Sequence, residues 1–505
     1  MDKEYRNFCS DFMELCKKDP KSDMIIVDAG NGVRRYTYEE TMEMCQRYGS
    51  FFAQQGLEAG DCIVTVMPNS VEAVLCFLSA ILFGIHYAPL PCTVTKREFL
   101  NWIALVKPKL FLKKNGVADF EMDLPVFGFE CDGDLSWLPK DARKIQPYKS
   151  PQVYLMTSGT TGLPKAMSIN TDILWSSGKS FVSFYGIEEG RYRFWNYLPM
   201  SYLGGLFNLA LIPLACSGSF VISEPFSGKT VLNFWNYTQK HEVTALWFVP
   251  TIVKGLLKMS KLIGQKHPEN VAENIQIGFL GTAPMDFYQK QEFEAAFGIR
   301  LLENFALSET TFLTAETEAN VRYREQGSVG SLLPYVKMKF VPIEGADTIA
   351  SIWIKTPYLF NGYLSADGIE KVELDDQGYF NTKDLGHLNE DNVLVLDGRD
   401  RDIIKRGGLF VSLVEIESLV KTFSGIEEAA AVPISHEFYG EAYDLFVIFN
   451  KKKDADKKIE SLYLWMLDNV VSYKMPERIM YCSEFPRTPS GKIQKKRILE
   501  SFREV

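Results

Sequence analysis

A polar turn whose composition suits phosphate binding lies between residues 157 and 165. It combines four hydroxyl side chains, two glycines and a lysine: Thr157, Ser158, Gly159, Thr160, Thr161, Gly162 and Lys165. Glycines let backbone N–H groups approach phosphate oxygens, hydroxyls donate further hydrogen bonds, and the lysine supplies positive charge. The spacing is not that of a Walker A loop, because Pro164-Lys165-Ala166 stands where that motif needs Gly-Lys-Ser/Thr. The residues therefore predict a phosphate-binding turn of another kind.

Alternating helical and strand-like patterns position this turn. An apolar strand precedes it, and residues 167–170 form another strand candidate after it. Similar segments recur along the first 280 residues, with helical patterns at 38–56 and 70–83 and apolar runs at 61–67, 85–88, 194–198, 219–222, 245–249 and 275–280. Such alternation predicts an α/β fold with helices on the faces of a sheet.

The pattern changes twice towards the C-terminus. After about residue 329, short strands joined by Gly, Asp and Asn turns indicate a β-rich subdomain. A charged, glycine-containing run follows residue 398, and the chain beyond it reads as a compact α+β unit. We therefore expect a large N-terminal domain, residues 1–398, and a small mobile C-terminal domain, residues 399–505. The stretch KKKDADKK at 451–458 is interpreted as a solvated loop.

Composition narrows the class of protein. The net charge of −9 disfavours a nucleic-acid partner, which normally requires a basic surface. The nine cysteines stand singly, as expected of reduced thiols in a cytoplasmic protein. The charged N-terminus is not a signal peptide. The apolar stretch from Ala73 to Leu90 contains Ser79, Gly84 and His86, so we expect a buried helix and strand rather than a transmembrane segment.

Several motifs, in a consistent order from about residue 35 to 500, resemble those of the ANL superfamily of adenylate-forming enzymes. This superfamily includes acyl- and aryl-CoA synthetases, nonribosomal peptide adenylation domains and firefly-type luciferases. The motifs are TSGTTGLPK at 157–165, LPMSYLGG at 198–205, GTAPM at 281–285, FALSE at 305–309, GSVG at 327–330, YFNTKDLG at 379–386, GRDRD at 398–402 and PSGKI at 489–493. The resemblance implies an ATP-dependent acid–thiol ligase that uses ATP, Mg²⁺ and coenzyme A.

The resemblance also implies roles for individual residues. The implied catalytic side chains are Lys165, Glu309, Lys405 and Lys492, of which Glu309 would hold the metal. The implied nucleotide-binding positions, besides residues 157–162, are Gly281, Thr282, Ala283, Glu303, Asn304, Phe305, Ser308, Asp384, Arg399, Arg401, Gly407 and Gly408. Asp384 would accept the ribose hydroxyls, a role suited to a bidentate carboxylate. The small domain would swing about Arg401 between two half-reactions, first presenting Lys492 and later the 405–408 segment.

The acid-binding pocket should be mostly apolar. Its expected lining is Tyr202, Phe207, Asn208, Phe248, Ala306 and Leu307, which favours an aryl or aliphatic acid. Some positions depart from the family pattern: Phe305 replaces tyrosine, and Ala306, Lys383 and Ala166 replace glycines. All five charged groups that matter, Lys165, Glu309, Asp384, Arg399 and Lys492, are nevertheless present, which favours an active enzyme.

Alternatives remain open at this point. An α-amino acid substrate is disfavoured because residues 201–206 lack the aspartate that pairs with an α-ammonium group. Thirteen residues follow Lys492 in this sequence, so we expect a free-standing ligase that donates to CoA or to a separate acyl carrier protein. A non-catalytic nucleotide-binding protein is the alternative from a different functional class. No motif in the sequence excludes a luciferase-like oxidation. We expect a monomer or homodimer.

Overall fold

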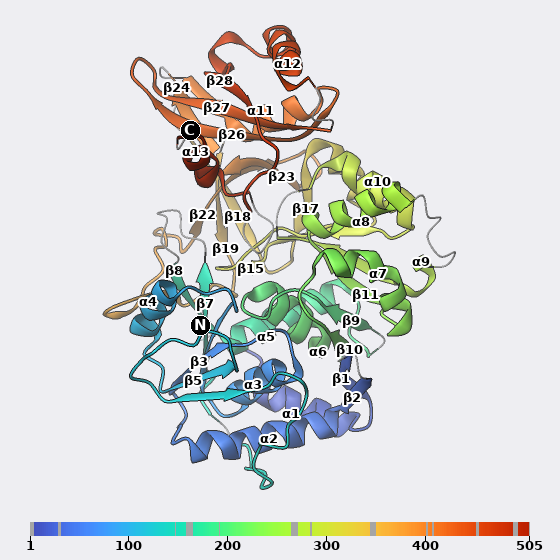
Figure 1. The fold of residues 1–505 in the computed structure, drawn as a ribbon, viewed down its shortest axis with the longest axis vertical. Coiled ribbons are helices and arrows are strands. Elements are labelled where there is room, and N and C mark those ends of the chain that lie inside the picture. Colours follow the sequence, from blue (N-terminus) through green and yellow to red (C-terminus); the bar gives the residue numbers. More distant parts are fainter. Residues whose placement is uncertain are drawn as a thin grey trace. The chain divides into compact units, whose positions relative to one another are not determined.

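The computed structural model describes residues 5–28, 32–146, 148–157, 165–190, 192–263, 271–282, 285–343, 350–399, 402–406, 409–450, 454–487 and 493–503. The chain forms two compact units: residues 1–315 with 356–373, and residues 316–355 with 374–505 (Figure 1). The second unit thus contains the β-rich segment as well as the C-terminal α+β segment. The domain boundary at residue 398 stays a prediction.

The first unit contains two sheets. One has the order β13 (Leu301–Glu303), β12 (Ile277–Leu280), β11 (Ala245–Phe248), β9 (Arg193–Asn196), β10 (Ser219–Ile222), β1 (Asp23–Asp28), β2 (Val33–Thr37). Its pairs are parallel except for the antiparallel pair of β1 with β2. The other has the order β21 (Gly368–Glu370), β20 (Gly362–Ser365), β8 (Lys165–Asn170), β7 (Gln152–Thr157), β4 (His86–Leu90), β3 (Cys62–Val66), β5 (Leu110–Lys114), β6 (Val126–Phe129).

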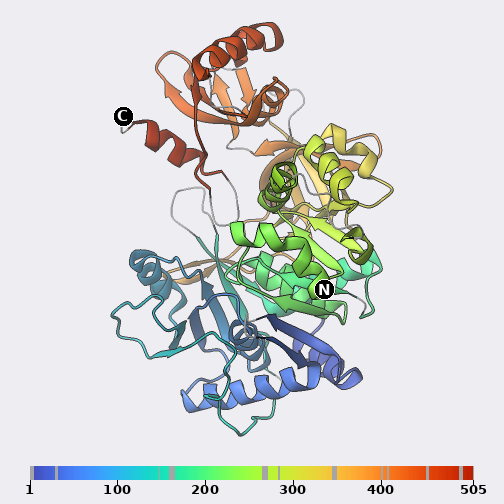
Figure 2. The same cartoon turned by 45° about the vertical axis from the view of Figure 1, so that its right-hand side comes forward.

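Helices connect these strands and cover them (Figures 1 and 2). They are α1 (Phe8–Lys18), α2 (Tyr38–Gln54), α3 (Val71–Leu82), α4 (Lys96–Val106), α5 (Thr171–Tyr185), the π-helix η1 (Gly204–Leu211), α6 (Ile212–Ala215), α7 (Gly228–Lys240), α8 (Pro250–Ile263), α9 (Val271–Asn274) and α10 (Phe287–Phe297). Local sequence sets their ends: Thr37 and Glu40 form a capping box before α2, and Gly186 ends α5 in a left-handed conformation.

The apolar stretch from Ala73 to Leu90 is confirmed as a buried helix and strand. All twelve residues of α3 are buried, and β4 pairs with β3 in the sheet interior. Among the described residues, no helix is long and apolar enough to cross a bilayer.

The second unit contains an antiparallel sheet with the order β17 (Ser328–Leu332), β23 (Val393–Arg399), β22 (Phe380–Leu388), β19 (Ala350–Lys355), β18 (Lys337–Pro342), preceded by the 3₁₀ helix η2 (Val321–Gln326). The C-terminal segment contributes β24 (Ile403–Arg406), β25 (Leu409–Ser412), α11 (Leu413–Lys421), β26 (Ile426–His436), β27 (Gly440–Phe449), α12 (Ala455–Asn469), η4 (Ser472–Lys474), β28 (Arg478–Tyr481) and α13 (Lys495–Arg503).

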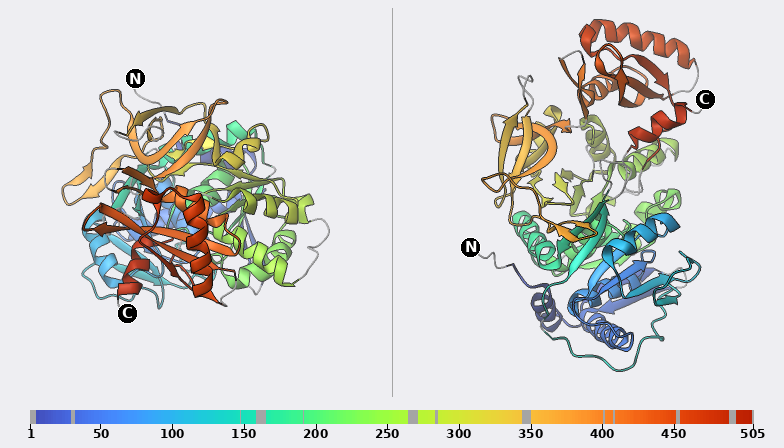
Figure 3. Two further views of the ribbon diagram at one scale, coloured as in Figure 1. Left: turned by 90° about the horizontal axis from the view of Figure 1, so that it is seen from above. Right: turned by 90° about the vertical axis from the view of Figure 1, so that its left-hand side faces the viewer.

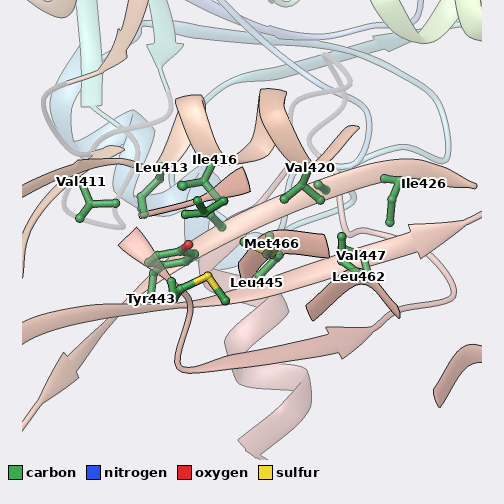
Figure 4. Close-up of a cluster of buried hydrophobic side chains, with 14 of the residues drawn as sticks. Val411, Leu413, Ile416, Val420, Ile426, Tyr443, Leu445, Val447, Leu462 and Met466 are labelled. Atoms are coloured by element: carbon green, nitrogen blue, oxygen red, sulfur yellow. The ribbon is translucent and has the colours of Figure 1, made fainter. Parts of the chain in front are cut away.

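Successive side chains of β26 and β27 point to opposite faces of the C-terminal sheet, and both faces are covered by helices. Ala429, Ala431, Leu445 and Val447 pack with α11 and α12, as Figure 4 shows for part of this cluster. Ala430, Val432 and Phe446 pack with Ile498 of α13 on the other face, and Figure 3 shows the two helical layers. The interpretation of 451–458 as a loop is wrong for 455–458, because α12 begins at Ala455.

Candidate active site

Paired strands bring the two ends of the predicted phosphate turn together. β7 and β8 are antiparallel neighbours, and Thr157 lies directly opposite Lys165. Ser158, Gly159, Thr160, Thr161 and Gly162 lie outside the described residues, as do the side chains of Thr157 and Lys165. The prediction that a strand follows the turn is confirmed by β8.

Glu309 lies at the tip of a small hairpin. The hairpin pairs β14 (Ala306–Leu307) with β15 (Thr311–Phe312), and residues 308–310 connect the two strands. The next segment, β16 (Thr314–Ala315), continues the chain. Glu309 is half-buried, and its backbone carbonyl accepts a hydrogen bond from Phe360 N at 2.8 Å. Ser308, beside it in the turn, is also half-buried.

Tyr363 holds the Glu309 carboxylate, a contact that sequence reasoning missed. Its hydroxyl donates to Glu309 Oε1 at 2.6 Å, although the two residues are 54 positions apart. Tyr363 belongs to β20, and it pairs with Met167 of β8, the strand that begins at Lys165. One strand ladder therefore links the metal-binding candidate to the base of the phosphate turn.

The residues expected around the adenine lie on two adjacent strand ends. Asn304 donates from its backbone N and its side-chain Nδ2 to Leu280 O, at 3.0 and 3.1 Å. This pair of bonds fixes Phe305 next to Gly281. Phe305 is buried, and its carbonyl accepts from Leu313 N at 2.9 Å. Ala283 lies outside the described residues.

Glu303 faces the protein interior. Its carboxylate forms an ion pair with Lys290 of α10, and both side chains are almost fully buried. A buried carboxylate requires such a partner, because an unpaired charge in a low-dielectric interior is costly. Nucleotide contact by Glu303 stays a prediction, whereas the structure gives its side chain a role in joining β13 to α10.

Two asparagines hold the LPMSYLGG segment. Asn69 donates to Leu198 O at 2.8 Å and accepts from Met200 N at 3.0 Å, and Asn196 donates to Gly205 O at 2.9 Å. The π-helix η1 starts at Gly204, within this segment, and π-helical turns are frequent at functional sites. Neither asparagine was singled out from the sequence.

Tyr202 folds back over the start of this π-helix. A Cβ added to Gly204 would lie 2.5 Å from Tyr202 Cε2, so only glycine leaves room for the ring. Burial raises the pKa of Tyr202 well above its ordinary value, so the hydroxyl stays protonated. It is therefore a neutral hydrogen-bonding group at the position where the resemblance places the substrate carboxylate.

An aromatic wall adjoins η1. Phe207 and Phe312 have ring centroids 5.4 Å apart, and Trp247 lies 5.5 Å from Phe312 and 4.8 Å from Phe279. Beside this wall Asn208 and Leu307 are half-buried, and Ala306 is exposed.

Phe248 is not part of this wall, and its place in the acid-binding pocket stays a prediction. Successive strand residues point to opposite faces, so Phe248 of β11 points away from the face of Trp247. Its ring packs 5.0 Å from Phe293 and 6.2 Å from Phe234, and it is fully buried in the core.

In the second unit, Asp384 and Arg399 form a cross-strand ion pair. They are opposite residues of β22 and β23, and Arg399 Nε donates to Asp384 Oδ1 at 2.6 Å. The carboxylate retains acceptor capacity beyond this bond. Lys383, which replaces a family glycine, has φ = 60° in the left-handed region, so the backbone keeps the turn that the glycine would make.

The remaining predicted residues lie largely outside the described part of the chain. Arg401, Gly407, Gly408 and Lys492 are outside it, and Lys405 is described only as a backbone position of β24. The flanks of Lys492 are ordered by an isolated bridge between Arg487 and Ile493.

Lys495 anchors the helix that follows this bridge. Its Nζ lies 2.8 Å from Glu417 and 3.1 Å from Asp402. Burial opposes the charge on Lys495, but the two carboxylates outweigh it and raise the pKa. The start of α13 is therefore tied to the segment that contains the expected hinge.

The environment of Glu309 suits a divalent cation. No ion pair joins Glu309 to any lysine or arginine that the structure describes. The Tyr363 hydroxyl bonds to Oε1 of Glu309, which leaves Oε2 of the same carboxylate for other partners. Within the described residues no three His, Cys, Asp or Glu side chains gather as metal ligands. One carboxylate plus nucleotide phosphates is the usual way in which proteins bind Mg²⁺.

Two family models match the chain. The model described as AMP-binding enzyme matches residues 12–364, and the model described as AMP-binding enzyme C-terminal domain matches residues 415–492. Among curated proteins, an oxalate–CoA ligase of Arabidopsis thaliana is 25% identical and is aligned over 97% of both chains. A 4-coumarate–CoA ligase of Vanilla planifolia is 24% identical over 91% of this chain and 87% of its own length.

Among solved structures, ATP-bound MatB from Rhodopseudomonas palustris superimposes with a TM-score of 0.85 at 24% identity, covering 98% of this chain and 99% of its own.

Proposed function

This chain belongs to the AMP-binding enzyme family and is an ATP-dependent, AMP-forming acid–CoA ligase, and we propose that its acid is apolar, either aryl or aliphatic. The observation that carries the proposal is that the accessible residues beside the Tyr202 segment, Asn208, Ala306 and Leu307, carry no charge and adjoin the buried rings of Phe207 and Phe312. An uncharged lining of this kind favours an apolar acyl group, whereas a second charge at the far end of the acid would lose its hydration there.

In the first half-reaction, a carboxylate oxygen of the acid bonds to the α-phosphorus of ATP, and the bond to pyrophosphate breaks. The acid is already ionised at neutral pH, so no general base is needed. The protein therefore acts mainly by positioning and electrostatics. We infer that the phosphate turn with Lys165 holds the β- and γ-phosphates and that Lys492 neutralises the reacting oxygens.

Glu309 would hold the magnesium ion. Bound there, Mg²⁺ supplies positive charge to the phosphate oxygens. The chain's own contribution is to keep one carboxylate oriented, through the hydrogen bond from Tyr363 and the backbone bond from Phe360.

In the second half-reaction, the CoA sulfur bonds to the acyl carbon and AMP leaves. We propose that Asp384 and Arg399 bind the ribose, and that the small domain turns about Arg401 to present Lys405, Gly407 and Gly408. The bridge between Arg487 and Ile493, together with Lys495, would keep the Lys492 loop in shape during this movement.

A panel of aryl and aliphatic acids tests the proposal. Pyrophosphate release is measured with ATP-Mg²⁺, with and without CoA. Acyl-CoA formation from at least one apolar acid, and its loss in Glu309→Gln, is the expected result. Turnover of short dicarboxylates alone would contradict the apolar assignment.

The same panel tests one alternative acceptor. Acyl-AMP accumulation that CoA does not discharge would favour a separate acyl carrier protein as acceptor.

We propose a cytoplasmic location, based on the single, reduced cysteines, of which all nine are unpaired in the structure.

A further inference from the structure

The indole N–H of Trp247 has no hydrogen-bond partner, although the residue is fully buried. Buried tryptophans usually place this donor against an acceptor, because an indole N–H can only donate and loses its bond to water on burial. The ring packs 4.8 Å from Phe279 and 5.5 Å from both Phe312 and Phe181, in the aromatic wall next to η1.

The donor lies beneath the turn that begins at Gly281. A Cβ built on Gly281 would lie 3.4 Å from Trp247 Nε1 and 3.1 Å from Asn304 Oδ1. The absence of a side chain at Gly281 therefore leaves the indole nitrogen next to the start of the turn expected at the nucleotide. An acyl group attached to AMP would pass this point.

Thr282 supplies a second, independent observation at the same turn. Its Oγ1 is buried and also lacks a partner. Its φ of 74° lies in the left-handed region, which a β-branched residue rarely adopts. A conformation of this kind persists only where the surroundings enforce it, and such residues cluster at ligand-binding sites.

We propose that Trp247 Nε1–H and Thr282 Oγ1–H donate hydrogen bonds to an oxygen of the acid beyond its carboxylate. The substrate is then an apolar acid that carries a hydroxyl, ether or carbonyl oxygen. Neither donor carries charge, so a neutral oxygen fits better than a second carboxylate. This inference rests on the proposed function and specifies its substrate class.

The chemical basis is selectivity through unpaired donors. A site built to hydrogen-bond a substrate oxygen discriminates strongly against the analogue that lacks it, because the donors are then left unsatisfied. Removing either donor should reduce that discrimination, which is measured within each variant as the ratio of kcat/KM for the oxygenated acid to that for its deoxy partner.

The test uses matched acids that differ by one oxygen: benzoate with its hydroxybenzoates, cinnamate with its hydroxycinnamates, and hexanoate with its hydroxyhexanoates. Trp247→Phe keeps a ring, and Thr282→Val keeps the branched shape, but each loses one donor. Trp102→Phe is the matched control, because Trp102 Nε1 is also buried without a partner but belongs to α4, in a different core cluster.

We expect at least one oxygenated acid to exceed its deoxy partner about tenfold or more in kcat/KM. That ratio should fall towards one in Trp247→Phe and in Thr282→Val, and persist in Trp102→Phe. If the unaltered enzyme uses each deoxy acid as well as its oxygenated partner, the inference is wrong and the proposed function still stands. A ratio that survives in both site variants would also overturn it, and absence of turnover with every acid would refute both proposals.

Discussion

The hydrogen bond from Tyr363 to Glu309 allows a quantitative prediction about metal use. Tyr363→Phe removes one hydroxyl and keeps the ring, which packs 4.9 Å from Phe360. The lost bond is a 2.6 Å O–H···O contact to a carboxylate. Bonds to charged groups contribute about 1.5–3 kcal/mol, and water can partly replace this one because Glu309 is half-buried. We therefore take about 1.5 kcal/mol, which corresponds to roughly a tenfold change in an equilibrium constant.

The expected result is about a tenfold rise in the Mg²⁺ concentration needed for half-maximal pyrophosphate exchange. The maximal rate at saturating Mg²⁺ should change much less, because the carboxylate itself remains. Mn²⁺ binding in the presence of ATP, followed by electron paramagnetic resonance, gives a readout that does not depend on turnover.

Tyr358→Phe is the matched control. Its hydroxyl makes a 2.6 Å hydrogen bond to Ser180 Oγ in the same compact unit, so Tyr358→Phe also loses one short hydroxyl bond but leaves the bond from Tyr363 to Glu309 in place. Metal affinity that is unchanged in Tyr363→Phe, or lowered equally in both variants, would refute the reasoning.

Three further predictions address the reaction, the fold and the pocket. Lys492→Ala should abolish acyl-AMP formation in pyrophosphate-exchange assays while calorimetry shows ATP binding largely retained; unchanged turnover would remove this lysine from the mechanism. Burial lowers the pKa of His86 below 6.5, and its Nδ1 accepts from Gln152 N at 2.9 Å, so protonation favours the unfolded chain. The free energy of unfolding should therefore fall as the pH drops through 6.5, and chemical denaturation should show a shallower pH slope for His86→Asn. Gly204→Ala should displace the Tyr202 ring and lower kcat/KM for the acid severalfold, with the loss mainly in KM; kinetics identical to those of the unaltered enzyme would contradict the contact geometry.

Much of the architecture could be predicted from local patterns. The strand at 219–222 has the predicted bounds, and those predicted at 245–249 and 275–280 differ from β11 and β12 by one or two residues, because short apolar runs between turn residues carry their own boundaries. The error at 455–458 has a local reason as well. A charged run reads as a loop, but its second half forms the exposed first turn of α12, whose apolar face is supplied by later residues.

The pairing of distant side chains could not be predicted in this way. Tyr363 reaches Glu309 only because β20 is added beside β8, and Lys290 reaches Glu303 only because α10 packs on β13. Neither contact has a signal in sequence spacing, since a hydrogen bond depends on position in space rather than along the chain.

The sequence by itself determined the family and the order of the motifs, because these depend on residue types at short spacing. Only the tertiary structure decided which face of β11 carries the aromatic wall. Trp247 and Phe248 are both large and apolar, so no pattern distinguishes them. Strand alternation assigns them to opposite faces, where both are fully buried; Phe248 packs on Phe293, and Trp247 has an indole N–H without a partner beneath Gly281.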